Sequence, residues 1–281
     1  MPELPEVETV RRGLEQSILG HQILKLTQNR ADLRVPFPDN FATHLEGRII
    51  QTLSRRGKYI LIHLNDEQIV ILHLGMSGRV TIIEDHQQYT PAKHDHLVIL
   101  LKGGTQIVYN DARRFGMVML SDEKSIDQHK SFAHMGPEPL GNHFSGTQLF
   151  ENLKTKKTPI KNALLDQSVV AGLGNIYVSE ALFYAGIRPD RIANSLTTKE
   201  TGTLYNCIIS VLNEAIKAGG SSLRDYQNTK GDMGYFQHHF AVYDRENHPC
   251  NGCSCSIEKT GGIKKIVQAG RSTFFCPQKQ K

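Results

Sequence analysis

The feature that most constrains the fold is a series of short, β-rich segments between residues 23 and 120, each followed by turn residues. Short apolar segments at this spacing are typical of antiparallel sheets, because a hairpin needs only a few residues to reverse the chain. The pattern therefore predicts an antiparallel β-sandwich or barrel. The segments are 23–26, 55–64, 68–74, 79–83, 96–101, 105–110 and 117–120.

Helical periodicity appears on both sides of this β-rich region. Apolar residues recur at helical spacing from Val7 to Ile18, and Gly20 suits the end of that helix. A second apolar stripe covers 204–216 and is followed by a pair of glycines at 219–220. The chain therefore combines helices and an antiparallel sheet in separate regions, which is the α+β class.

The stretch 134–146 is rich in Pro and Gly and is interpreted as an interdomain connection. We expect three parts. Residues 1–131 form an N-terminal helix with the β-sandwich. Residues 132–240 form a helical domain, and residues 241–281 form a cysteine-rich hairpin.

Composition and charge narrow the class of protein. Hydrophobic residues make up 39% and charged residues 22%, which are globular values, and no stretch approaches the roughly 18 apolar residues of a membrane helix. The N-terminus lacks the pattern of a signal peptide, so a cytoplasmic location is expected. The net charge is +5, and lysines cluster at 154–161 and at 259–281. Such clusters suit a polyanion such as nucleic acid, although a solvated surface explains them equally well.

Most of the cysteines lie close together near the C-terminus, which favours local metal chemistry over a disulfide framework. Cys250 and Cys253 have the spacing of a zinc knuckle. A second knuckle would pair Cys276 with residue 279, which is Lys279. Three alternatives follow. Cys255 supplies the fourth ligand, three cysteines bind zinc with a water, or the hairpin stands without metal. The remaining cysteine, at position 207, is expected to be buried on a helix.

The N-terminal sequence MPELPEVETVRRGL resembles the signature of the bacterial formamidopyrimidine-DNA glycosylases, which repair oxidised bases. Further blocks resemble this family in family order and span essentially the whole chain. They are RRGKY (55–59), HLGMSGR (73–79), KHDH (93–96), DARRFG (111–116), GPEPL (136–140), KKTPIK (156–161), VAGLGNIYVSE (170–180), GGSSLRD (219–225) and AGRSTFFC (269–276).

The resemblance implies a set of catalytic residues. Removal of the initiating methionine would leave Pro2 with a secondary α-amine, whose reference pKa of about 8 makes it a better nucleophile at neutral pH than lysine. By family position, Pro2 is the Schiff-base nucleophile, Glu3 donates a proton to the sugar and Glu6 supports them. Lys58 is the proton donor in β-elimination. Arg271 contacts the lesion phosphate and assists δ-elimination.

The resemblance also implies DNA-binding residues. An enzyme acting on C1′ must extrude the nucleotide, and side chains must then fill the gap in the base stack. Met76, Arg113 and Phe115 match the family's void-filling residues. The segment 172–175 belongs to the family's helix–two-turn–helix element, and 221–237 matches its lesion-capping loop. Glu180 matches an acidic residue that family members place near the active site. The phosphate contacts implied by family position are His94, Lys156 and Asn175.

The sequence therefore predicts a bifunctional DNA glycosylase and abasic-site lyase. Its expected substrates are 8-oxoguanine and formamidopyrimidines in damaged double-stranded DNA, removed by base flipping and followed by β,δ-elimination. Zinc is the expected structural cofactor, and the protein is expected to be a cytoplasmic, nucleoid-associated monomer with no membrane partner. Two alternatives remain, an endonuclease VIII-like glycosylase for oxidised pyrimidines and a non-catalytic module that binds damaged DNA.

Overall fold

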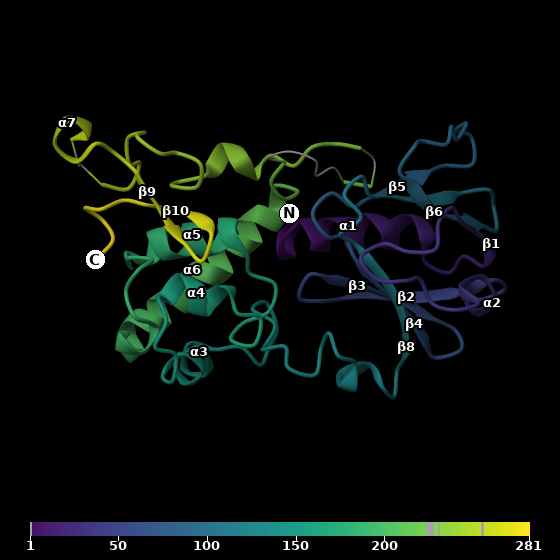
Figure 1. Ribbon diagram of the computed structural model, residues 1–281, viewed down its shortest axis with the longest axis horizontal. Helices are drawn as coiled ribbons and strands as arrows, with labels where there is room; N and C mark the ends of the chain where they lie inside the picture. The colour runs from purple at the N-terminus through teal and green to yellow at the C-terminus, as the bar shows by residue number, and fades with distance from the viewer. Residues whose placement is uncertain (1, 223–227, 230, 254–255) are drawn as a thin grey trace. The chain divides into compact units, whose positions relative to one another are not determined.

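The computed structural model describes residues 2–222, 228–229, 231–253 and 256–281. The chain divides into two compact units, and most of their helices and strands are labelled in Figure 1. The first unit contains residues 1–133 and 218–235, and the second contains residues 134–217 and 236–281. The segment that follows the long helix of the second unit thus belongs to the first.

The first unit begins with helix α1 (Leu4–Ile18), as the apolar spacing predicts. Its start is fixed by a carboxylate, because Glu6 Oε2 accepts the backbone N–H of Glu3 at 2.8 Å. Pro5 lies in the first turn, where its missing N–H costs no hydrogen bond. The predicted apolar face of α1, from Val7 to Ile18, is buried.

Two four-stranded antiparallel sheets form the rest of the first unit, with strand orders β2-β3-β4-β8 and β1-β6-β7-β5. Helix α1 contacts β2 and β3 of one sheet and β5 of the other. The helix and both sheets contribute side chains to one apolar core. This arrangement confirms the predicted α+β fold with a β-sandwich. The strands are β1 (Ile23–Gln28), β2 (Ile50–Arg56), β3 (Tyr59–Leu64), β4 (Gln68–His73), β5 (Arg79–Ile83), β6 (Asp95–Leu101), β7 (Gln106–Asn110) and β8 (Met117–Asp122); short helices are α2 (Phe41–Leu45) and η1 (Ile126–Gln128).

The segment 55–64, expected to be one strand, is divided between two strands. The chain reverses at Gly57, whose φ of 56° favours glycine, and Lys58 follows in the same turn. Arg56 and Tyr59 are therefore paired across the β2–β3 ladder. This hairpin places Lys58 at a turn rather than within a strand.

The second unit is largely helical, as predicted, and residues 176–183 of its helix α5 are all buried, because this helix lies in the middle of the unit. Helix α6 packs against α3 and α5, and the C-terminal hairpin β9–β10 also contacts α5. The helices are α3 (Gly146–Leu153), α4 (Ile160–Leu165), α5 (Asn175–Ala185), α6 (Thr198–Lys217) and α7 (Ile257–Thr260), with 3-10 turns η2 (Ala193–Ser195) and η3 (Phe236–His239) and strands β9 (Lys264–Gln268) and β10 (Arg271–Phe275). Among the described residues, no helix is long and apolar enough to cross a membrane.

Candidate functional site

The N-terminal residues lie in a buried, hydrogen-bonded position rather than in a free tail. Pro2 is buried, and Glu3 and Glu6 are only 2% and 1% exposed. While Glu6 Oε2 accepts the Glu3 N–H, Glu6 Oε1 accepts both the N–H and the hydroxyl of Ser221, at 2.7 and 3.0 Å. The Glu6 carboxylate therefore joins the backbone beside Pro2 to the start of the loop that begins at Gly219 and Gly220.

A cluster of charges anchors the Lys58 turn to helix α1. The carboxylate of Glu8 accepts hydrogen bonds from Arg11, Arg12 and Arg55. Burial tends to raise the pKa of Glu8, but these guanidinium groups outweigh it and the pKa is lowered. Arg55 Nη1 also donates to the Gly57 carbonyl at 3.0 Å, next to Lys58. Sequence reasoning missed Glu8 and Arg55, although both lie inside motifs that it singled out.

His73 is a further residue that sequence reasoning missed. It pairs with Tyr59 across the β3–β4 ladder, and their rings are 4.7 Å apart. Burial, together with the positive charges of Lys58 and Arg34, lowers the His73 pKa to about 4. The Gly75 N–H donates to His73 Nδ1 at 3.1 Å, which requires that this nitrogen be unprotonated. The imidazole beside the Lys58 turn is therefore neutral at physiological pH.

Two neighbouring loops of the first unit carry the expected void-filling side chains. Met76 lies between β4 and β5, and Arg113 and Phe115 lie between β7 and β8. All three are exposed, and the Arg113 guanidinium lies 4.9 Å from the centroid of the Phe115 ring. The His94 carbonyl accepts the N–H of Asp111, which brings a third loop to the same place. The described structure thus brings together four predicted DNA contacts of this unit.

The remaining predicted DNA contacts belong to the second unit. Asn175 begins helix α5, and its side-chain amide donates to the Ser272 carbonyl at 2.9 Å. Ser272 follows the exposed Arg271 in β10, so the helix–two-turn–helix segment is fastened to the hairpin beside that arginine. Lys161 donates to the same Ser272 carbonyl at 3.0 Å.

The lysine cluster at 154–161 carries less free charge than its sequence suggests. Lys161 is fully buried, Lys154 pairs with Glu151, and Lys156 Nζ lies 2.9 Å from Asp166 Oδ2. The acids come from α3 and from the end of α4, on either side of the 154–161 segment.

Glu180, matched by the resemblance to an acidic residue near the active site, has a supporting role within the second unit. It is fully buried in α5 and accepts the backbone N–H groups of Ala241, Val242 and Tyr243 at 2.8–3.0 Å. Burial raises the pKa of this carboxyl, although the three N–H donors and Arg245 act in the opposite direction.

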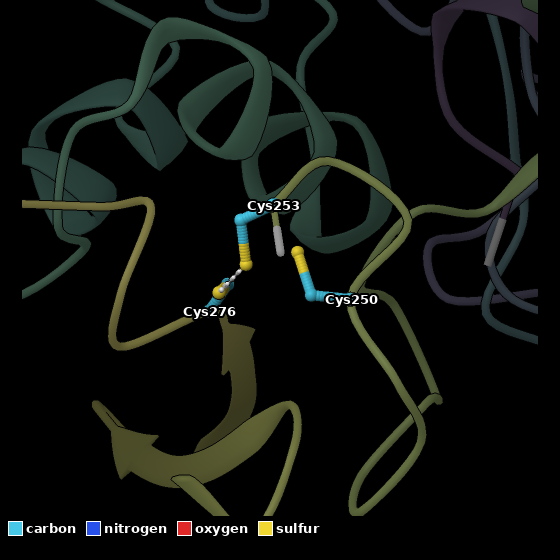
Figure 2. Close-up of side chains that lie close together, drawn as sticks. All are labelled: Cys250, Cys253 and Cys276. Atoms are coloured by element: carbon cyan, nitrogen blue, oxygen red, sulfur yellow. Dashed lines mark hydrogen bonds between the residues drawn. The ribbon is translucent and has the colours of Figure 1, made fainter. Parts of the chain in front are cut away.

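Three of the predicted metal ligands converge, as Figure 2 shows. The sulfur atoms of Cys250, Cys253 and Cys276 lie within 4.8 Å of one another, and those of Cys253 and Cys276 are 3.6 Å apart. Clustered cysteine sulfurs are the donor set that suits a structural zinc ion. The fourth candidate, Cys255, lies outside the described residues.

Lys279 occupies the place where a second knuckle would have its other cysteine. Its backbone N–H donates to Cys276 Sγ at 3.5 Å, while its ammonium lies 4.1 Å from the ring centroid of Phe183 and 5.5 Å from that of Tyr184. These are cation–π distances. The predicted burial of the remaining cysteine, Cys207, is only partial, because one side of α6 is half-exposed there.

Comparisons with known proteins agree with this arrangement. The N-terminal domain model of formamidopyrimidine-DNA glycosylase matches residues 1–118, and the H2TH domain model of the same enzyme matches residues 135–227. Formamidopyrimidine-DNA glycosylases from Rhodospirillum rubrum and Dinoroseobacter shibae are 48% and 52% identical to the chain, and each alignment covers 100% of both proteins.

Solved structures give the same result. A Lactococcus lactis FPG mutant bound to Fapy-dG-containing DNA has a TM-score of 0.89 at 36% identity, and MutM bound to DNA containing carbocyclic 8-oxo-G has 0.88 at 37%. Both comparisons cover 100% of each chain. The fold and the two matched domains define a DNA glycosylase with an H2TH domain. The chain belongs to the formamidopyrimidine-DNA glycosylase family.

Proposed function

We propose that this protein excises oxidised purines, 8-oxoguanine and formamidopyrimidines, from duplex DNA and then cleaves the resulting abasic site by β,δ-elimination. The observation that carries the proposal is the buried N-terminus, in which Glu6 fixes the backbone immediately after Pro2. The relatives support the substrate class, since one structure holds Fapy-dG and another a carbocyclic 8-oxo-G. The protein acts as a monomer in the cytoplasm, at the nucleoid.

The chemistry begins at Pro2 once the initiating methionine has been removed. The proline nitrogen attacks C1′ while the bond from C1′ to the base nitrogen breaks, and the base leaves with the proton that the attacking amine loses. Glu3 donates a proton to the sugar ring oxygen as the ring opens, and the nitrogen and C1′ become an iminium. This cation draws electrons from C2′, so water can take up a C2′ proton while the C3′–O bond breaks and the 3′ phosphate leaves.

Lys58 and Arg271 complete the proposed elimination steps. Lys58 donates the proton needed in β-elimination, and the Glu8–Arg55 ion pair holds its turn against α1. Arg271 is exposed in β10, where its guanidinium can bind the phosphate and assist the second elimination. His94, Lys156 and Asn175 bind backbone phosphates, and Met76, Arg113 and Phe115 fill the gap left by the flipped nucleotide.

Borohydride trapping tests the function directly. The mature protein is incubated with duplex DNA holding one 8-oxoguanine opposite cytosine, and Pro2→Gly serves as the paired variant. A covalent adduct that disappears in Pro2→Gly supports the proposal. Adduct formation only on an oxidised pyrimidine would favour the endonuclease VIII-like alternative. DNA binding without any adduct would favour the alternative that the protein is a non-catalytic module that binds damaged DNA.

We also propose that Cys250, Cys253 and Cys276 hold one structural zinc ion. The convergence of their sulfur atoms supports this assignment, and the ion would cross-link the hairpin to the segment before it. The zinc content of the purified protein tests it: Cys276→Ser should lose the metal and Cys207→Ser should keep it. Unchanged zinc in Cys255→Ser would exclude Cys255 as the fourth ligand.

A further inference from the structure

One hydroxyl joins the two loops that carry the void-filling side chains. Ser77 Oγ donates to Asp111 Oδ1 at 2.5 Å and accepts the backbone N–H of Arg113 at 3.0 Å. Ser77 is buried and directly follows Met76. The backbone beside Met76 is thereby tied to the backbone of Arg113, although the two residues come from different loops.

Asp111 holds this link in place through further hydrogen bonds. It is fully buried, and its Oδ2 accepts the Gly116 N–H at 2.8 Å and the Tyr109 hydroxyl at 3.2 Å. Its backbone carbonyl lies 2.8 Å from His96 Nε2. Since moving a buried carboxylate would leave several donors unsatisfied, this network resists displacement. Burial also raises the pKa of Tyr109 well above its usual range, so its hydroxyl stays protonated as a donor.

The backbones of the two loops are in direct contact. A Cβ atom at Gly75, whose φ is 67°, would overlap the backbone at Phe115. A Cβ atom at Gly78 would lie 2.6 Å from the Tyr109 hydroxyl, and one at Gly116 would overlap it. Glycine is therefore required for the close approach at these positions, and the rigid base of the loops contrasts with the exposed side chains at their tips.

We propose that Ser77 and Asp111 are positioning residues that hold Met76, Arg113 and Phe115 in one fixed arrangement. This inference rests on the proposed function, in which these three side chains enter the base stack. Because the loops are already joined, insertion needs little ordering of the protein, and Arg113 meets the base opposite the lesion at a set position. The network thereby contributes to discrimination between cytosine and adenine at that position.

The test compares Ser77→Ala with Ser121→Ala. The control removes a hydroxyl that lies 3.2 Å from Ser125 Oγ, near the opposite end of β8. Single-turnover excision is measured on 8-oxoguanine opposite cytosine and opposite adenine, and strand cleavage is measured on a preformed abasic site. A fluorescent cytosine analogue opposite the lesion reports insertion through its change in emission.

Ser77→Ala should slow excision opposite cytosine about tenfold, the effect of one strong hydrogen bond. The cytosine-to-adenine preference and the emission change should shrink with it, while cleavage of the abasic site should change less. Ser77→Thr, which keeps a hydroxyl, should restore the preference. Should Ser77→Ala fail to fold, Tyr109→Phe can be compared with Ser121→Ala instead. This variant removes one donor to Asp111, so the same losses in excision rate, preference and emission change should appear but be smaller.

Equal preference and equal emission change in Ser77→Ala and Ser121→Ala would overturn the inference while leaving the proposed function intact. A mature wild-type protein that excises no oxidised purine at all would overturn the proposed function, and the inference with it.

Discussion

At the scale of single residues, Glu6 has a chemical environment that only a carboxylate satisfies. Both of its oxygens face donors, namely the N–H of Glu3 and the N–H and hydroxyl of Ser221. Glu6→Gln would turn an amide N–H₂ toward one of these donors. We expect borohydride trapping to slow about 10- to 100-fold, because an unsatisfied buried donor costs about 1–3 kcal/mol. DNA affinity should hardly change.

Glu15→Gln is the matched control, since Glu15 lies on the same helix and pairs with Arg11 on its exposed side. If the Glu6 and Glu15 variants trapped equally fast, Glu6 would have no positioning role. A parallel loss of DNA affinity in Glu6→Gln would point instead to a general disruption of the N-terminal region.

His73 makes the stability of the first unit depend on pH. Its pKa is lowered from 6.5 to about 4 in the folded protein, so between these values the unfolded chain takes up a proton that the folded protein excludes. The free energy of unfolding should therefore fall as the pH drops from 6.5 toward 4, by about 2–3 kcal/mol from this group. His73→Asn should flatten that decline, because the amide oxygen can still accept from Gly75 but does not titrate.

Denaturant unfolding at pH 6.5 and 4.5 measures this effect, with the exposed His143→Gln as control. A His73→Asn variant that loses as much stability over this interval as the wild type would show that other groups cause the decline. The sequence did not reveal this histidine, because its neutrality depends on burial beside Lys58 and Arg34.

At the scale of elements, the last six residues fasten the hairpin to the end of helix α5 without any metal. Gln280 is buried; its Oε1 accepts the Cys276 N–H at 2.7 Å, and its Nε2 donates to the Ile187 carbonyl at 2.9 Å. The Lys281 N–H donates to the Gly186 carbonyl at 2.9 Å, and Lys279 lies over Phe183. These contacts bind the chain end to α5 independently of the sulfur cluster.

Gln280→Ala should therefore destabilise the second unit by about 1–3 kcal/mol, because it leaves a buried N–H and a buried carbonyl unsatisfied. Chelation of the proposed zinc ion should lower the melting temperature of the wild type but leave the hairpin amides protected from hydrogen exchange. Chelation of Gln280→Ala should remove that protection. The exposed Gln278→Ala is the control. Equally fast exchange in chelated wild type and chelated Gln280→Ala would contradict this prediction.

Periodicity predicted α1 and six of the eight sandwich strands with only small errors in their bounds, but the apolar stripe at 204–216 left out the first turns of α6, which begins at Thr198. It failed at β2 and β3, because polar residues before Gly57 lack the alternation of a half-buried strand and the left-handed turn depends on one glycine. The family motifs supplied the candidate side chains. They could not supply the contacts between distant segments, such as Glu8 with Arg55 or Ser77 with Arg113, because those arise only from folding.

At the scale of the whole molecule, the net charge of +5 does not show where positive charge is available to DNA. Acidic neighbours neutralise two lysines of the 154–161 cluster. Lys156, a proposed phosphate contact, pairs with Asp166, so phosphate must compete with that carboxylate. Asp166 Oδ1 also accepts the N–H of Ser168, a bond that an asparagine oxygen can still make. Asp166→Asn should therefore free Lys156 while keeping the loop in place.

We expect Asp166→Asn to bind duplex DNA about two- to fivefold more tightly at low salt, and Lys156→Ala to bind more weakly with a salt dependence reduced by about one phosphate contact. Fluorescence anisotropy over a range of salt concentrations measures both. Glu151→Gln, which frees Lys154 instead, is the control for a general increase in positive charge. Equal gains in affinity for Asp166→Asn and Glu151→Gln would show that long-range charge, rather than competition at Lys156, governs binding. A gain confined to Asp166→Asn and abolished by Lys156→Ala would locate the competition at that lysine.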